Sequence, residues 1–236
     1  MSESLQSRYE SVCARVEQSA KAAGRSIEEI TLIVVTKNHP AQLVLDLLEF
    51  GARDFGENRD QEASSKAEAV AESLAASGSP PDYRWHFVGQ LQSNKVRSVL
   101  RYAQAVHSLD RTSLLQALEK ELAKEPERSQ LDVFIELNLT DDPQRGGLDP
   151  KSLEEFTEAV LRVPQLKLRG VMGVATLDRQ AERDFEFIRA CSDRVRALSP
   201  GANQISAGMS GDFETAISFG ATHLRIGTAI TGERQY

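Results

Sequence analysis

Short apolar runs alternate with longer amphipathic stretches along the chain, and this alternation predicts the fold. A stretch at 5–23 has the composition of an opening helix. Short apolar runs then predict strands at 31–36, 53–56, 84–88, 104–108, 131–138, 166–172, 203–206 and 222–226. The stretches between them predict helices at 40–50, 59–77, 93–101, 111–124, 150–162, 179–198 and 210–219. Strands that alternate with helices form right-handed βαβ units and a parallel sheet.

Eight predicted strands fit an α/β fold, a single (β/α)8 TIM barrel with an extra N-terminal helix, as one domain over residues 1–236. The strands at 53–56 and 203–206 rest on the weakest patterns, because both runs are short and partly polar. The alternative is an open doubly wound sheet, which usually carries a glycine-rich turn after its first strand. Here the first strand is followed by Lys37-Asn38-His39-Pro40, so the barrel is favoured.

Composition and charge narrow the class of protein. The net charge is −7, so no strong basic field recruits nucleic acid or an anionic membrane. The apolar runs are too short to span a bilayer, and the polar N-terminus shows no secretory signal. Cys13 and Cys191 are the only cysteines and lack metal-ligand spacing. We therefore expect a cytoplasmic monomer that binds no metal, no nucleic acid and no membrane.

Lys37 stands at the carboxyl end of the first predicted strand, where active sites of such barrels lie. Desolvation at a strand end disfavours the ammonium, lowers the pKa and leaves an amine able to form a Schiff base. The alternative is a lysine that extends its amine into water, as many lysines do.

The loops after the seventh and eighth strands predict a phosphate site. Ser206–Asp212 offers small residues, hydroxyls and free backbone N–H groups that lead into the helix at 210–219, and Gly227-Thr228 allows close backbone approach and adds a hydroxyl. Barrels often bind phosphate with these two loops. The alternative is an ordinary N-cap and turn.

Three further polar residues lie on the predicted strands. Arg225 follows apolar neighbours, and a buried arginine needs an acceptor; the alternative is a structural salt bridge at the barrel rim. His86 is more typical of a hydrogen-bonded core residue than of a general base, and His107 is not supported as a metal ligand.

Six motifs now resemble one known family. They are Thr36-Lys37, Phe55–Asn58, Trp85–Lys95, Val171-Met172, Gly208–Asp212 and Arg225–Gly232. In this order they resemble the pyridoxal phosphate homeostasis protein family over about residues 5–234. The resemblance implies a barrel like the N-terminal domain of alanine racemase, with pyridoxal 5′-phosphate (PLP) held as a covalent aldimine on Lys37.

The same resemblance assigns the other cofactor-binding residues. Ser210, Gly227 and Thr228 match phosphate-binding positions, and Arg225 matches the arginine that faces the pyridine nitrogen. Asn58 matches an asparagine near the cofactor, and Met209 would pack beside the ring. We expect the phosphate to lie across the barrel mouth from Lys37. PLP-dependent apo-enzymes are the partners that the resemblance implies.

Three functions compete at this stage. The first is a cofactor-handling protein that holds PLP in vitamin B6 homeostasis without turnover and has no catalytic residues. The second is an amino-acid racemase on the same lysine, which needs an acid/base on each face of the cofactor. We expect no such second base, because the chain ends at Tyr236 and no tyrosine falls at a predicted strand end. The third is a Schiff-base aldolase without a cofactor.

Overall fold

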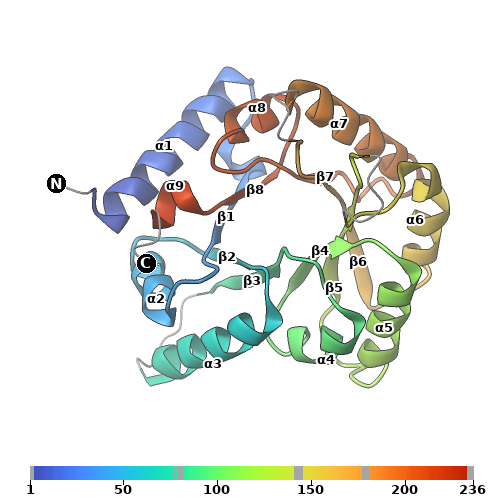
Figure 1. Ribbon diagram of the computed structural model, residues 1–236, viewed down its shortest axis with the longest axis horizontal. Helices are drawn as coiled ribbons and strands as arrows, with labels where there is room; N and C mark the ends of the chain where they lie inside the picture. Colours follow the sequence, from blue (N-terminus) through green and yellow to red (C-terminus); the bar gives the residue numbers. More distant parts are fainter. Residues whose placement is uncertain (1–2, 77, 79–81, 141–145, 177–180, 233–236) are drawn as a thin grey trace.

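The chain forms a closed barrel of parallel strands in the order β1-β2-β3-β4-β5-β6-β7-β8. The computed structural model describes residues 3–76, 78, 82–140, 146–176 and 181–232. Figure 1 looks along the barrel, with the helices arranged around its outside. The strands are β1 (Thr31–Val35), β2 (Asp54–Glu57), β3 (Arg84–Phe87), β4 (Ala105–Leu109), β5 (Leu131–Glu136), β6 (Leu166–Met172), β7 (Gln204–Ser206) and β8 (His223–Ile226). Every predicted strand is confirmed to within two residues at each end, including the two with weak patterns.

The helices follow the predicted order with some different bounds. They are α1 (Leu5–Ala22), α2 (Ala41–Glu49), α3 (Asp60–Ala76), α4 (Val96–Val99), α5 (Thr112–Leu122), α6 (Leu153–Leu161), α7 (Ala181–Leu198), α8 (Phe213–Ser218) and α9 (Thr228–Thr231). Short 3-10 turns at Ser93–Lys95 and Pro150–Ser152 replace the starts of two predicted helices. Residues 77, 179 and 180, at the ends of two predicted helices, lie outside the described residues.

The predicted helix at 210–219 is wrong at its start, and the short helix α9 was not predicted. Asp212 precedes α8 as its N-cap residue, and its carboxylate accepts a hydrogen bond from the Met209 N–H at 2.6 Å. This bond holds 209–212 as a turn, so the helix begins only at Phe213. The helix α9 lies directly after β8, beside α1 (Figure 1).

Side-chain periodicity explains why these segments pack as they do. The helix α5 buries Leu114, Leu115, Leu118 and Leu122, the spacing of one helical face. The strand β4 is buried along its whole length, because helices cover its outside and side chains fill the barrel inside. The connected hydrophobic core therefore lies between the strands and the helices, while side chains outside that cluster, among them Phe134 and His107, fill the barrel interior.

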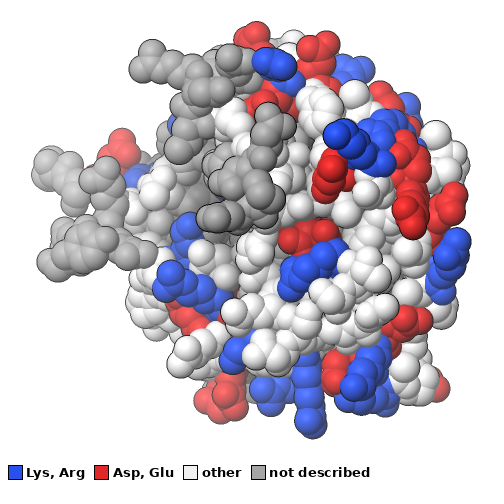
Figure 2. Space-filling model, turned by 45° about the vertical axis from the view of Figure 1, so that its right-hand side comes forward, with Lys and Arg blue, Asp and Glu red and all other residues white. Residues whose placement is uncertain are grey.

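The surface does not separate acidic from basic groups on the face drawn in Figure 2, where Lys and Arg are interspersed with Asp and Glu. Within the described part of the chain, no helix is long and apolar enough to cross a bilayer.

Candidate functional site

The predicted site residues gather at the carboxyl ends of four neighbouring strands, β7, β8, β1 and β2, and Lys37 and Arg225 come from the middle two. The two strands pair in parallel, with Val34 opposite Ile226. A Cβ atom added to Gly227 would lie 3.4 Å from the carbonyl oxygen of Val35, so the loop after β8 contacts the strand that carries Lys37. The expectation that the phosphate loops lie across the mouth from Lys37 is wrong, because closure of the barrel makes the first and last strands adjacent.

Lys37 lies in a tight turn immediately beyond β1. The His39 N–H donates to the Thr36 carbonyl at 3.1 Å, and Asn38 has a φ of 63°. A positive φ at the third position of a turn favours glycine or asparagine, which explains Asn38. The expected desolvation of Lys37 is wrong: its side chain is exposed, because the chain has already left the sheet. The exposed amine is open to a ligand in the barrel mouth.

The two predicted phosphate loops contact each other. The Ser210 hydroxyl oxygen accepts hydrogen bonds from the Thr228 hydroxyl at 3.2 Å and from the Ala229 N–H at 3.3 Å. In the described part of the chain, the N–H groups of Ser210, Gly211 and Thr228 have no hydrogen-bond acceptor. The Met209 N–H is different, since it donates a hydrogen bond to the Asp212 carboxylate. The loops therefore leave several donors in one place for an anion.

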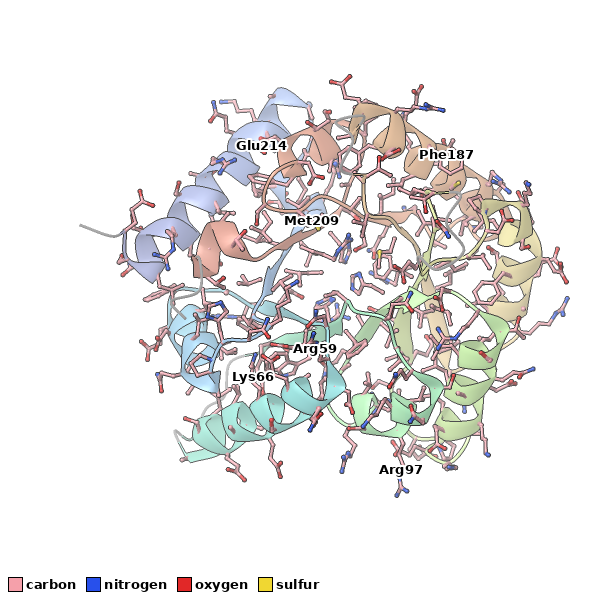
Figure 3. All side chains as sticks on the ribbon, viewed as in Figure 1. Arg59, Lys66, Arg97, Phe187, Met209 and Glu214 are labelled. Atoms are coloured by element: carbon pink, nitrogen blue, oxygen red, sulfur yellow. The ribbon has the colours of Figure 1, made fainter. Side chains whose placement is uncertain are left out.

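A glycine makes this loop possible. Gly208 has a φ of 93°, and a Cβ atom at this position would lie 2.8 Å from the Cβ atom of Ala216. The loop after β7 can therefore lie against α8 only with glycine here. Met209, the next residue, is partly buried and lies toward the centre of the barrel in Figure 3.

Arg225 is buried inside the mouth and bonds to neutral acceptors. Its guanidinium donates to the Ser206 hydroxyl at 2.7 Å and to the Gly173 carbonyl at 2.9 Å. These two acceptors are uncharged, so the contacts differ from the alternative of a salt bridge at the barrel rim. Burial lowers the pKa of Arg225 to about 10, while the nearby Glu136 and Asp212 carboxylates raise it. The guanidinium is therefore still charged at neutral pH.

A chain of hydrogen bonds continues from Arg225 through the barrel interior. The Ser206 hydroxyl contacts His107 Nδ1 at 2.8 Å, His107 Nε2 contacts His86 Nδ1 at 2.9 Å, and His86 Nε2 contacts Asp54 at 2.8 Å. His86 is thus a hydrogen-bonded core residue, as predicted, and His107 is one as well. Burial lowers the pKa of both imidazoles, so both are neutral at pH 7.

The residues at the two ends of this series of hydrogen bonds determine which group donates at each step. The Asp54 carboxylate only accepts, so His86 donates from Nε2 and accepts at Nδ1. His107 then donates from Nε2 and accepts at Nδ1, and Ser206 donates its hydroxyl proton to it. Arg225 only donates, which matches the free lone pair of Ser206. Each donor therefore points away from Arg225 and toward the amino-terminal end of the barrel.

Asn58 follows β2 and is partly buried. Its side-chain oxygen has no hydrogen-bond partner among the described residues, and the residue lines an open hollow between the loops after β2 and β3. A Cβ atom at Gly89 would lie 2.3 Å from the Asn58 carbonyl oxygen. The glycine in the Trp85–Lys95 motif therefore lets the loop after β3 pack directly on Asn58.

Lys66 is a buried residue that the sequence analysis missed. Its amine, on α3, donates to the Glu57 carboxylate at 2.6 Å and to the Thr36 carbonyl at 2.7 Å, directly before Lys37. Helical spacing carried a signal for it, because Lys66 falls on the same face as the buried Ala63, Ala67 and Val70. A lysine within an apolar stripe needs a partner inside the protein.

Glu136 is a second missed residue, at the end of β5. It shares the inward face of that strand with Phe134, whose ring stacks on His107. Burial raises the pKa of Glu136 to about 7, and the nearby Asp110 raises it further, while Arg225 and Arg111 lower it.

No metal centre and no disulfide accompany this site. No group of His, Cys, Asp and Glu among the described residues is arranged to hold a metal ion. Cys13 and Cys191 are both free thiols.

Several known proteins are similar to this chain in sequence or in fold. The family model described as alanine racemase, N-terminal domain, matches residues 12–235. A pyridoxal phosphate homeostasis protein of Mycobacterium bovis is 38% identical over 231 residues, which cover 94% of this chain and 90% of the relative. The protein of that name from Escherichia coli is 36% identical over 225 residues and 94% of this chain, with 93% of the relative covered. The structure of PipY from Synechococcus elongatus with PLP bound has a TM-score of 0.76 at 29% identity, covering 92% of this chain and 100% of PipY.

Proposed function

The chain belongs to the pyridoxal phosphate homeostasis protein family, within the wider family of alanine racemase N-terminal domains, and from that premise we propose that it binds PLP at the mouth of its barrel. The observation that carries the proposal is the joined pair of loops, in which Ser210 accepts hydrogen bonds from Thr228 and Ala229. Unpaired N–H groups lie in the same loops, and a phosphate dianion accepts hydrogen bonds from such donors.

Lys37 is the proposed covalent anchor. Its side chain is exposed, and the loop after β8, which would hold the phosphate, contacts the end of the strand that Lys37 follows. Lys37 would hold the PLP aldehyde through its deprotonated amine as a covalent aldimine, with loss of one water molecule. The aldehyde is thereby held in a reversible bond rather than left free to modify other proteins.

Arg225 is the proposed partner of the pyridine nitrogen. Ser206 and Gly173 hold its guanidinium from behind. A charged donor at this nitrogen favours its unprotonated form, which makes the ring a weaker electron sink than one paired with a carboxylate. Asn58 and Met209 complete the proposed pocket, with an amide and an apolar side chain beside the ring.

We propose that the protein stores and hands over the cofactor without turnover. PLP-dependent apo-enzymes stay the predicted recipients. The single domain over residues 1–236, the monomeric state and the cytoplasmic location also stay predictions.

Racemisation is the second candidate, and Glu136 is the observation that favours it. In the closed barrel β5 lies opposite β1, so Glu136 and Lys37 come from opposite sides of the mouth. A carboxyl group with a pKa of about 7 is suited to acid–base work at neutral pH.

The deciding experiment for binding is an absorption spectrum of the purified protein mixed with PLP, followed by borohydride reduction and mass mapping. We expect a visible aldimine band and reduced cofactor on Lys37. The band is expected to vanish in Lys37→Ala. Reduced cofactor mainly on another lysine would overturn the anchor.

The remaining site residues are tested by cofactor retention. We expect Arg225→Ala and Ser210→Ala to weaken retention with unchanged circular dichroism. Unchanged affinity in both variants would contradict the assignment of the pocket. Amino-acid racemisation by the purified protein, lost in both Lys37→Ala and Glu136→Gln, would replace storage by catalysis.

A further inference from the structure

A set of charged residues surrounds the turn that carries Lys37. The Lys66 side chain is only 4% exposed, and its amine donates to the Thr36 carbonyl at 2.7 Å, to Glu57 at 2.6 Å and to Glu62 at 2.9 Å. An ammonium group has three protons, so these acceptors use all of them. Figure 3 shows Lys66 on the side of α3 that faces the barrel. We call Lys66, Glu57 and Glu62 the charged clamp.

The charged clamp holds the backbone on both sides of Lys37. Before it, the Thr36 hydroxyl donates to Glu57 at 2.7 Å, and the Thr36 carbonyl accepts from Lys66. After it, the Asn38 N–H donates to the Glu62 carboxylate. The residues on either side of Lys37 are therefore held by the charged clamp, whereas the Lys37 side chain itself extends into solvent.

Stability alone is a weak reason for this arrangement. Buried ions pay a large desolvation cost, and apolar side chains of similar volume often serve a core as well or better. The cost is visible at Glu57: one of its oxygens has no partner among the described residues, and burial raises its pKa against the opposing effect of Lys66. What apolar residues cannot do is bond to a carbonyl, a hydroxyl and an N–H group at fixed places in a turn.

We propose that Lys66, Glu57 and Glu62 are positioning residues for Lys37. They fix the turn in one conformation, so that the flexible lysine side chain starts from a defined point beside the phosphate loops. Less conformational freedom is then lost when the amine meets the aldehyde. This inference rests on the proposed function and adds to it the residues that make Lys37, among all lysines of the chain, the one that reacts.

The sharpest test uses Glu62, because its side chain is 27% exposed and Lys66 keeps two other acceptors without it. Glu62→Ala removes the acceptor for the Asn38 N–H, whereas Glu62→Gln keeps a side-chain oxygen in the same place. Glu154→Ala is the matched control, since it breaks a surface ion pair between Glu154 on α6 and Arg194 on α7. Two quantities are measured: the rate at which the aldimine band grows with PLP, and the hydrogen exchange of the Asn38 amide in cofactor-free protein.

We expect Glu62→Ala to slow growth of the band about tenfold, the effect of one hydrogen bond to a charged group. Its Asn38 amide should exchange faster than in the wild type. Glu62→Gln and Glu154→Ala should both behave like the wild type. Lys66→Met should have a larger effect, and if it fails to fold the Glu62 pair still decides the question.

The outcomes separate the two proposals. No band in the wild type would overturn the proposed function and, with it, the role of the charged clamp. A normal band and rate in Glu62→Ala would overturn the charged clamp alone. Equal slowing in Glu62→Ala and Glu62→Gln would show that charge rather than position matters, which would also overturn the inference.

Discussion

Lys37 and Arg225 belong to adjacent strands, yet the protein supports them in opposite ways. Lys37 is held from outside the barrel by ions, since Lys66 and two carboxylates bond to its neighbours. Arg225 is held from inside the barrel by a series of hydrogen bonds through neutral groups, the Ser206 hydroxyl and two imidazoles. This series ends at the charged carboxylate of Asp54. A support made of ions fixes position at a cost in desolvation, whereas neutral hydrogen bonds cost less and leave the charge of the arginine for a ligand.

The largest expected effect comes from removing the ammonium of the charged clamp. Lys66→Met leaves Glu57 buried without its cation, so we expect the free energy of unfolding to fall by about 3–5 kcal/mol. Urea denaturation measures the change. Adding Glu57→Leu to Lys66→Met should restore part of the stability, because the uncompensated charge is gone. A loss below about 1 kcal/mol in the single variant would mean that the pair is not desolvated.

Lowering the pH should destabilise the hydrogen bonds through His86 and His107 that support Arg225. His86 and His107 have pKa values below their unfolded value, through burial first; Arg84 lowers both further and Arg225 lowers that of His107, while Asp54 raises that of His86. Because the folded pKa of each histidine lies below its unfolded value of roughly 6.5, the stability that the histidine contributes to the protein is fully present above that pH. This stability is lost as the pH falls from there toward the folded pKa. In this pH range each histidine that stays neutral in the folded protein lowers the free energy of unfolding by up to about 1.4 kcal/mol per pH unit.

The variant His107→Leu tests this pH dependence. Urea denaturation at several pH values below neutrality should give it a shallower loss of stability than the wild type, together with lower stability at neutral pH. His223 is also buried with a lowered pKa, so the slope should fall rather than disappear. An unchanged slope would contradict the placement of His107 in the chain.

The smallest expected effect is at the contact between Arg225 and its support. Ser206→Ala removes one acceptor from Arg225 and the donor to His107, for a loss of about 1–2 kcal/mol. Retention of PLP should weaken by less than tenfold, because Gly173 still holds the guanidinium. Ser108→Ala is the matched control: its buried hydroxyl has no partner among the described residues, so its loss should be neutral. Equal effects in the two variants would contradict the chain of hydrogen bonds.

The sequence predicted the strands well, because alternation of apolar and amphipathic segments is a local signal. Counting strand ends then placed Lys37, Ser210, Arg225 and Thr228 at one end of the barrel. The position of the phosphate loops relative to Lys37 was not local, since it depends on β8 closing against β1. The start of α8 was also missed, because a side-chain bond from Asp212 decides it.

The two supports were missed for different reasons. Lys66 could have been found, because its position on the buried face of α3 is readable from helical spacing. The contact between His86 and His107 could not, since it depends on the register of β3 with β4, where His86 pairs with Ala105. A histidine on one strand carries no local sign of a second histidine on the next.

The pairing of β1 with β8 sets when the site comes into existence during synthesis. Lys37 leaves the ribosome early, whereas Arg225 and Thr228 come near the end of the chain. Bonds between these distant segments form late, because a long loop must close first. A nascent or truncated chain that lacks β8 has the lysine without the arginine or the phosphate loop. Only a closed barrel that includes β8 brings the three together, so a partly made protein lacks the complete site that we propose for the cofactor.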